Sequence, residues 1–192
     1  SKVSVAVNSG TAALHLALSL LDLKNKEVIL PSLSFVSTAH AVLYNGGKPI
    51  FADIEQDTLC IDPDAIRKKI SKKTALILPV HFAGIPSNLT ELQNLANENN
   101  LEIIEDAAHA LGATYKNRTV GSIADMTVFS LHPVKHITTG EGGLVVTDNS
   151  ELAERLRRFR NHGIMQDHYQ RQKQGTWNYD MEEIGYNYRL PE

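Results

Sequence analysis

Lys135 lies in a loop whose composition suits a lysine nucleophile. The loop reads HPVKHITTGEGG over residues 132–143 and separates two apolar segments. A lysine partly removed from water there can lose its proton and attack an aldehyde. Ser130, five residues earlier, offers a hydroxyl to a phosphate. Most loop lysines are only solvated charges, and the loop alone leaves that alternative open.

A carboxylate follows another apolar segment. Asp106 comes directly after residues 101–105 and opens into the sequence DAAH. A buried carboxylate is costly unless it is paired or caps a helix. Helix capping is one interpretation; the other is a partner for the protonated ring nitrogen of pyridoxal phosphate (PLP), because a pyridinium is the better electron sink. His109, taken alone, is typical of a hydrogen-bonded structural histidine.

Two earlier loops also carry candidate binding residues. The segment NSGTAAL, residues 8–14, places small residues before a predicted helix, where free N–H groups and the helix dipole favour a phosphate. It matches neither a P-loop nor a dinucleotide fingerprint, so a capped helix is the alternative. Phe35 lies among small polar residues in PSLSFVST, at a strand end. It can join the core or stack on a flat ligand ring.

The elements that must position these residues alternate between strand and helix patterns. Such alternation, with continuously apolar strands, predicts an α/β fold with a mostly parallel sheet covered by helices on both faces. Ligands bind at the carboxyl ends of such strands, where the four loops begin. Asp62 as N-cap and Pro63 at the first helical position mark one strong helix start. Strands are expected at residues 3–7, 27–30, 49–52, 74–80, 101–105, 126–131 and 142–147, and helices at 11–21, 36–44, 88–99, 151–161 and from residue 63.

Composition narrows the possible functions. The net charge is −3 and the charges are interspersed, so no nucleic-acid or membrane partner is expected. Cys60 is the only cysteine, which excludes an internal disulfide and a cysteine-based zinc site. The first residues lack a signal-peptide pattern, so a cytoplasmic protein is expected. His132 and His136 form an H-x-x-x-H pair, but Pro133 interrupts it and no third ligand is evident, so no metal is predicted.

Five motifs together resemble one family. SGTAAL, PSLSFVST, EDAAHALGA, FSLHPVKHITTGEGG and GYNYR, in this order and spacing, resemble the DegT–DnrJ–StrS aminotransferases. The resemblance runs from Ser1 to Glu192. Members are fold type I PLP enzymes that aminate keto sugars on nucleotide carriers, so the resemblance implies the PLP-binding large domain of such an enzyme.

The resemblance also implies roles for particular residues. Lys135 matches the lysine that holds the cofactor and moves a proton, first as general base and then as acid. Asp106 matches the partner of the pyridine nitrogen. The remaining implied cofactor contacts are His109 at the ring hydroxyl, Phe35 on the ring face, Gly10, Thr11 and Ser130 around the phosphate, and Asn187 at the phosphate of the neighbouring subunit's cofactor. The role of Asn187 implies a homodimer with shared active sites.

Details of the wording point to a branch of the family. Related sugar 3-dehydrases carry histidine where this chain has Lys135, so transamination is favoured. FSLHPVKHITTGEGG, FRNHGI and WNYDMEEIGYNYRLPE resemble the pseudaminic-acid branch. That branch aminates C4 of a UDP-linked 4-keto-6-deoxy-N-acetylhexosamine, with L-glutamate as the donor.

The expected domain organisation leaves alternatives open. Residues 1–162 are expected to form the PLP-binding large domain without its N-terminal lead-in. Residues 163–192 are expected to be a polar connecting segment leading to a small C-terminal domain that is absent. One alternative is a truncated, non-catalytic module of the same fold that acts as an assembly unit. Another alternative is a nucleotide-binding domain of dehydrogenase or kinase type. The glycine motif of such domains is missing from this sequence.

Overall fold

A seven-stranded sheet forms the centre of the molecule, in the order β1-β9-β8-β5-β4-β2-β3. The computed structural model describes residues 3–165, 172–173, 175 and 177–191. Strands β8, β5, β4, β2 and β3 run parallel, whereas β9 is antiparallel to both of its neighbours. The predicted α/β fold with a mostly parallel sheet is thus confirmed. The strands are β1 (Val3–Val7), β2 (Glu27–Pro31), β3 (Lys48–Ala52), β4 (Thr74–Ile77), β5 (Glu102–Asp106), β8 (Met126–Ser130) and β9 (Gly143–Thr147).

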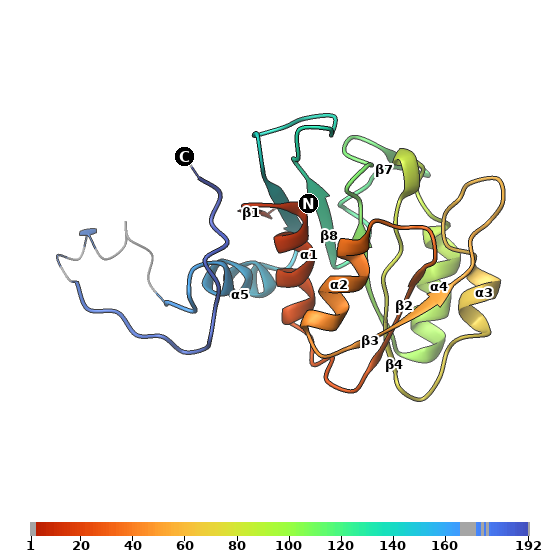
Figure 1. Cartoon of the computed structure of the whole chain (residues 1–192), viewed down its shortest axis with the longest axis horizontal. Helices are drawn as coiled ribbons and strands as arrows, with labels where there is room; N and C mark the ends of the chain where they lie inside the picture. The colour runs from red at the N-terminus through yellow and green to blue at the C-terminus, as the bar shows by residue number, and fades with distance from the viewer. Residues whose placement is uncertain (1–2, 166–171, 174, 176, 192) are drawn as a thin grey trace.

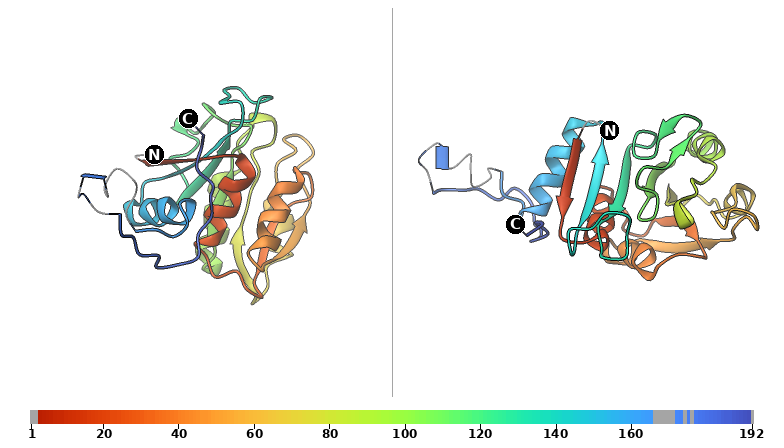
Figure 2. Two further views of the ribbon diagram at one scale, coloured as in Figure 1. Left: turned by 60° about the vertical axis from the view of Figure 1, so that its left-hand side comes forward. Right: turned by 90° about the horizontal axis from the view of Figure 1, so that it is seen from above.

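Helices cover both faces of this sheet, as the sequence predicted (Figures 1 and 2). Alternate residues of a strand point to opposite faces. Val28 and Leu30 of β2 therefore join the core beneath α1, α2 and α5, while Ile29 joins the core beneath α3 and α4. The helices are α1 (Gly10–Ser19), α2 (Val36–Tyr44), α3 (Pro63–Arg67), α4 (Leu89–Asn99) and α5 (Ser150–Arg160).

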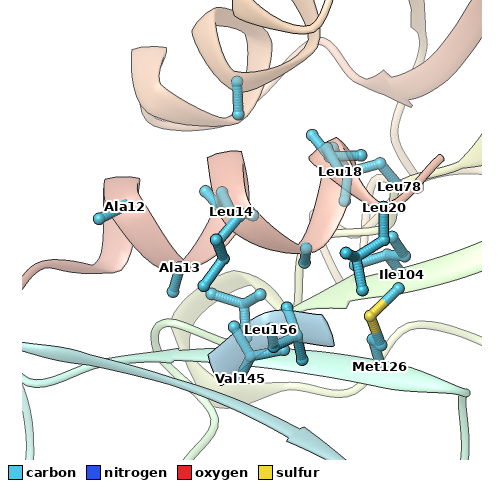
Figure 3. Close-up of a cluster of buried hydrophobic side chains, with 14 of the residues drawn as sticks. Ala12, Ala13, Leu14, Leu18, Leu20, Leu78, Ile104, Met126, Val145 and Leu156 are labelled. Carbon is cyan, nitrogen blue, oxygen red and sulfur yellow. The ribbon is translucent and has the colours of Figure 1, made fainter. Parts of the chain in front are cut away.

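Helix α1 is the most deeply buried helix of the candidate site. Residues 12–18 are all buried, and Figure 3 shows Leu14 and Leu18 among side chains of several strands and of α5. Ser9 caps the helix by accepting the N–H of Ala12 at 3.0 Å. This packing fixes the N-terminus of α1 relative to the carboxyl ends of β5 and β8, which is where the predicted site residues lie.

The ends of two strands differ from those predicted. Strand β4 ends at Ile77 rather than at residue 80, because Pro79 has no N–H for a sheet ladder. The carbonyl of Pro79 instead accepts the N–H of Asp106 at 2.9 Å, and the carbonyl of Asp106 accepts the N–H of His81 at 3.0 Å. Both the N–H and the carbonyl of Asp106 are therefore hydrogen-bonded. Asp106 is the last residue of β5 and not the first residue after it.

One hairpin was not predicted from the sequence. Strands β6 (Thr114–Tyr115) and β7 (Arg118–Thr119) pair antiparallel around Lys116 and Asn117, both with positive φ. Strands of two residues are too short to give a periodic pattern. The short 3-10 helix η1 (Phe82–Gly84) was likewise not predicted. The helix start at Asp62 and Pro63 is confirmed, since the Asp62 side chain caps α3.

The C-terminal segment returns to the body of the molecule (Figure 1). Tyr186 and Tyr188 stack with ring centroids 4.9 Å apart, and the Tyr188 hydroxyl lies 2.8 Å from Nδ1 of His15 in α1. Of the predicted connecting segment, residues 166–171, 174, 176 and 192 lie outside the described residues. None of the helices in the described ranges is both long and apolar enough to cross a membrane.

Candidate active site

A pocket of about 310 Å³ opens at the carboxyl ends of β5 and β8, between the N-termini of α1 and α2. Its walls contain every predicted cofactor-binding residue except Asn187. Residues from five separate segments of the chain meet there, because parallel strands bring their carboxyl ends to one edge of the sheet. The predicted residues in the wall are Gly10, Thr11, Phe35, Asp106, His109, Ser130 and Lys135.

Asp106 lies at the back of the pocket with only 4% of its surface exposed. Its Oδ2 accepts the hydroxyl of Thr38 at 2.8 Å, and its Oδ1 accepts the N–H of Ala108 at 3.2 Å. Burial raises the pKa of the Asp106 carboxyl, while these two hydrogen bonds act to lower that pKa. An ionised carboxylate has about four lone-pair sites, so acceptor capacity remains for a donor in the pocket.

The start of α1 and the end of β8 form a cradle for an anion. The N–H groups in the first turn of a helix have no acceptor within that helix, so Gly10 and Thr11 present donors to the pocket. A Cβ at Gly10 would lie 2.9 Å from Cβ and 3.0 Å from Oγ of Ser130. Only glycine therefore lets the helix start come this close to the Ser130 hydroxyl. The arrangement suits a phosphate.

Lys135 and His109 lie at the mouth of the pocket. Lys135 is half-buried, and its N–H donates to the carbonyl of His132 at 2.9 Å, which closes a turn in the loop. Burial lowers the pKa of His109, and the positive charge of Lys135 lowers it further. Both residues also line a neighbouring pocket, so their side chains lie near one another. His109 also packs edge-on against Phe82, with ring centroids 6.2 Å apart.

Phe35 forms a second wall with an exposed aromatic face. It is the N-cap residue of α2, in an extended conformation, and 73% of its surface is exposed. Loop residues this apolar are usually buried, so the exposure leaves the ring face free to stack on a flat ligand. Phe35 lies in the pocket wall, which is consistent with the predicted stacking of its ring on the cofactor.

Asn187 lies outside this pocket. It is exposed and forms an isolated backbone bridge with Asn161 at the end of α5. The structure therefore does not bring Asn187 together with the other predicted residues of the same chain. Its predicted contact is with the cofactor of a neighbouring subunit, and that contact stays a prediction.

Two hydroxyl residues of the site, Thr38 and Ser34, were not among the residues predicted from the sequence. Thr38 and Ser34 share a hydrogen bond of 2.7 Å, and Thr38 binds Asp106 directly. The available signal was the spacing of PSLSFVST. A hydroxyl three residues after the N-cap Phe35 lies in the first turn of α2, on the side facing β5.

A buried polar cluster behind the site was also missed. His81 and Glu105 are fully buried, and Glu105 Oε2 accepts the Thr127 hydroxyl at 2.8 Å. His81 Nδ1 accepts the N–H of Ser87 at 3.1 Å, which leaves its proton on Nε2, 3.5 Å from Glu105 Oε2. Glu105 precedes Asp106 in β5, so its side chain points to the opposite face of the sheet.

At the rim, Nε2 of His132 lies 3.7 Å from Oε1 of Glu141. Within the part of the chain that the structure describes, no three side chains of the metal-binding types lie together. The second half of the H-x-x-x-H pair, His136, lines a neighbouring pocket that shares Lys135 and His109 with the first.

Comparison with known proteins shows the family of this chain. The model of the DegT/DnrJ/EryC1/StrS aminotransferase family matches residues 1–192. The chain belongs to this family. Spore coat polysaccharide biosynthesis protein SpsC of Bacillus subtilis is 41% identical over 192 residues, which cover 99% of this chain and 49% of SpsC. The chain spans about half the length of the curated relatives it matches.

Solved structures show the same similarity. Helicobacter pylori PseC, an aminotransferase involved in the biosynthesis of pseudoaminic acid, has a TM-score of 0.88 and 36% identity, over 98% of this chain and 50% of PseC. Bacillus subtilis NtdA with bound cofactor PMP has a TM-score of 0.86 and 36% identity, over 98% of this chain and 41% of NtdA. These similarities confirm the predicted family and its fold.

The residues of the pocket fit pyridoxal phosphate, the cofactor expected from the family. The cradle at Gly10 leaves no room for a Cβ beside Ser130, and it presents donors suited to the phosphate. Asp106 is a buried acceptor that would suit a protonated ring nitrogen, and Phe35 has an exposed ring face that would suit stacking. Lys135 has the amine that the cofactor would need. These four groups line one cavity, which is the geometry that the cofactor requires.

Proposed function

We propose that this chain forms the cofactor-binding part of a PLP-dependent sugar aminotransferase. The convergence of Lys135, Asp106 and the anion cradle of α1 on one pocket carries this proposal. The proposal includes a large domain of residues 1–162 and a polar connecting segment of residues 163–192. It also includes a cytoplasmic location, for which a single, unpaired Cys60 is the support.

The chain's own residues would divide the work. Bound PLP supplies an electron sink that stabilises negative charge at the reacting carbon. Asp106 would accept a hydrogen bond from the ring nitrogen and so would keep that nitrogen protonated. The first turn of α1 and the Ser130 hydroxyl bind the phosphate. Lys135 would hold the cofactor, and its amine, once free, would serve as the base and acid that moves a proton between the substrate carbon and the cofactor.

The proposed substrates are a nucleotide-linked 4-keto-6-deoxy sugar, with UDP as the carrier, and L-glutamate. The amino group of glutamate replaces the keto oxygen at C4, and glutamate becomes the corresponding 2-oxo acid. The similarity to PseC and SpsC supports a role in surface glycan or pseudaminic acid biosynthesis.

A homodimer with shared active sites completes the proposal. Asn187 lies outside the pocket of its own chain, which is compatible with a role at the neighbouring subunit's phosphate. Asn187→Ala is expected to weaken PLP binding in the dimer and to leave any monomer fraction unaffected.

The reaction can be tested directly. The PLP-loaded chain is mixed with L-glutamate and a UDP-linked 4-keto-6-deoxy-N-acetylhexosamine, and the 4-amino sugar and 2-oxoglutarate are measured by mass spectrometry. The proposal expects both products in equal amounts. Matched dTDP and GDP sugars test the carrier. Binding of PLP without any amino sugar from any carrier would instead favour a non-catalytic module of the same fold.

A further inference from the structure

The Asp106 carboxylate is held by a chain of two hydroxyl groups. Thr38, with none of its surface exposed, lies between Asp106 and Ser34. Its Oγ1 is 2.8 Å from Asp106 Oδ2 and 2.7 Å from Ser34 Oγ. Both distances are those of good hydroxyl hydrogen bonds. The pocket wall contains Ser34 and Asp106 but not Thr38, so Thr38 acts on the pocket only through its two neighbours.

The direction of these hydrogen bonds follows from counting protons. A hydroxyl has one proton to donate, and an ionised carboxylate can only accept. Thr38 therefore gives its proton to Asp106, and Ser34 must donate to Thr38. The reverse order would need a protonated Asp106 that donates to Thr38, with Thr38 donating to Ser34. Ser34 would then donate to the carbonyl of Phe35, which lies 3.2 Å away.

We propose that Thr38 is a positioning residue. Its buried hydroxyl, oriented by Ser34, holds the Asp106 carboxylate in place to accept a hydrogen bond from the protonated ring nitrogen of the cofactor. This inference rests on the proposed function. Thr38 would fix the orientation of the Asp106 carboxylate and favour its ionised form. A carboxylate without fixed donors is free to rotate and to take up a proton.

The electrostatic balance at Asp106 supports this role. Burial is the largest influence on its pKa and raises it, which favours the neutral acid. The hydrogen bond from Thr38 is the largest influence in the opposite direction, ahead of the one from Ala108. If Asp106 were a neutral acid, its proton would face the N–H of the pyridinium, and the favourable interaction between opposite charges would be lost. Loss of the Thr38 hydroxyl therefore removes the main support for the ionised form.

Two variants of Thr38 separate the hydroxyl from the volume. Thr38→Val keeps the shape and removes the hydroxyl, whereas Thr38→Ser keeps the hydroxyl. The first readout is the titration of the Asp106 carboxyl, followed by ¹³C NMR in the cofactor-free chain. We expect Thr38→Val to shift that titration to higher pH and Thr38→Ser to stay close to the unchanged chain. Thr90→Val, which removes a hydroxyl from α4 on the other side of the sheet, is the matched control.

The second readout is PLP affinity. One hydrogen bond to a charged group corresponds to a loss of about tenfold to hundredfold in affinity for Thr38→Val. Thr38→Ser should recover most of it. If Thr38→Val fails to fold, Ser34→Ala can be used instead. It removes the hydroxyl that donates to Thr38, so we expect it to shift the Asp106 titration to higher pH by a smaller amount.

The outcomes separate the two proposals. An Asp106 titration that is the same in Thr38→Val and in the unchanged chain would overturn the inference, whether or not PLP binds. A failure of the unchanged chain to bind PLP, with the titration shifted as expected, would overturn the proposed function and leave the hold of Thr38 on Asp106 established.

Discussion

Alanine at Gly10 is expected to damage phosphate binding specifically. The added Cβ would lie 2.9 Å from Cβ of Ser130, against an ordinary carbon–carbon contact of about 3.5–4.0 Å. Ser130 belongs to β8, in which every residue is buried, so it has little room to yield. The helix start must therefore move away from Ser130. We expect a loss of about 1–3 kcal/mol in the free energy of unfolding, as for other overpacked sites.

The functional consequence is measurable with a pair of ligands. Moving α1 opens the cradle, so PLP affinity should fall by about tenfold or more, corresponding to about 1.4 kcal/mol. The affinity for pyridoxal, which has the ring without the phosphate, should stay nearly unchanged. Both affinities are measured by absorbance titration, and stability by urea denaturation.

Gly47→Ala provides a matched control. A Cβ at Gly47 would lie 3.0 Å from Cγ1 of Val42, at the far end of α2 and away from the pocket. It should reduce stability to a similar degree and leave PLP affinity unchanged. An equal loss of PLP and pyridoxal binding in Gly10→Ala, or an equal loss in the two alanine variants, would refute the assignment of the cradle to the phosphate.

Three further predictions concern other groups of the site. Asp106→Asn should still bind PLP at Lys135 but lose most of the rate of amino transfer, because an amide cannot stabilise the charged ring nitrogen; a fully active variant would contradict its role. Thr127→Val should leave Glu105 Oε2 without its hydroxyl donor and lower the free energy of unfolding by about 1–3 kcal/mol, with unchanged PLP affinity; a loss of affinity would place this cluster in the site. The pKa of His109 is lowered in the folded state, so its contribution to stability is complete above about pH 6.5 and is lost as the pH falls below that value. His109→Gln should therefore flatten the decrease of unfolding free energy with falling pH, as measured by urea denaturation from pH 7.5 to 5; an unchanged slope would contradict this account.

The sequence alone was enough to predict the pocket residues that lie at or just after the ends of strands. Continuous apolar runs identified β2, β5 and β8, and the rule that ligands bind at their carboxyl ends placed Phe35, Asp106 and Ser130 together. The family resemblance supplied the assignment of roles. The convergence of these residues on one pocket is a matter of topology, which the alternation of strands and helices largely determines.

The residues that support the site were much harder to predict. Thr38 and Glu105 act through partners that lie 68 and 22 residues away along the chain. No local pattern shows which hydroxyl will meet which carboxylate once the strands have paired. The antiparallel direction of β9 was also not predicted, because strand direction depends on which strands pair and no local pattern shows that. The β6–β7 hairpin was too short for a periodic signal.

The most direct test of the account is to locate the bound cofactor. The chain is mixed with PLP, its visible absorption is recorded, the adduct is reduced with borohydride, and the modified peptide is identified by mass spectrometry. Lys72→Ala, at an exposed lysine, is the control for Lys135→Ala. The account predicts one main adduct, on Lys135, that persists in Lys72→Ala and disappears in a folded Lys135→Ala chain. Labelling spread over surface lysines and unchanged in Lys135→Ala would contradict it.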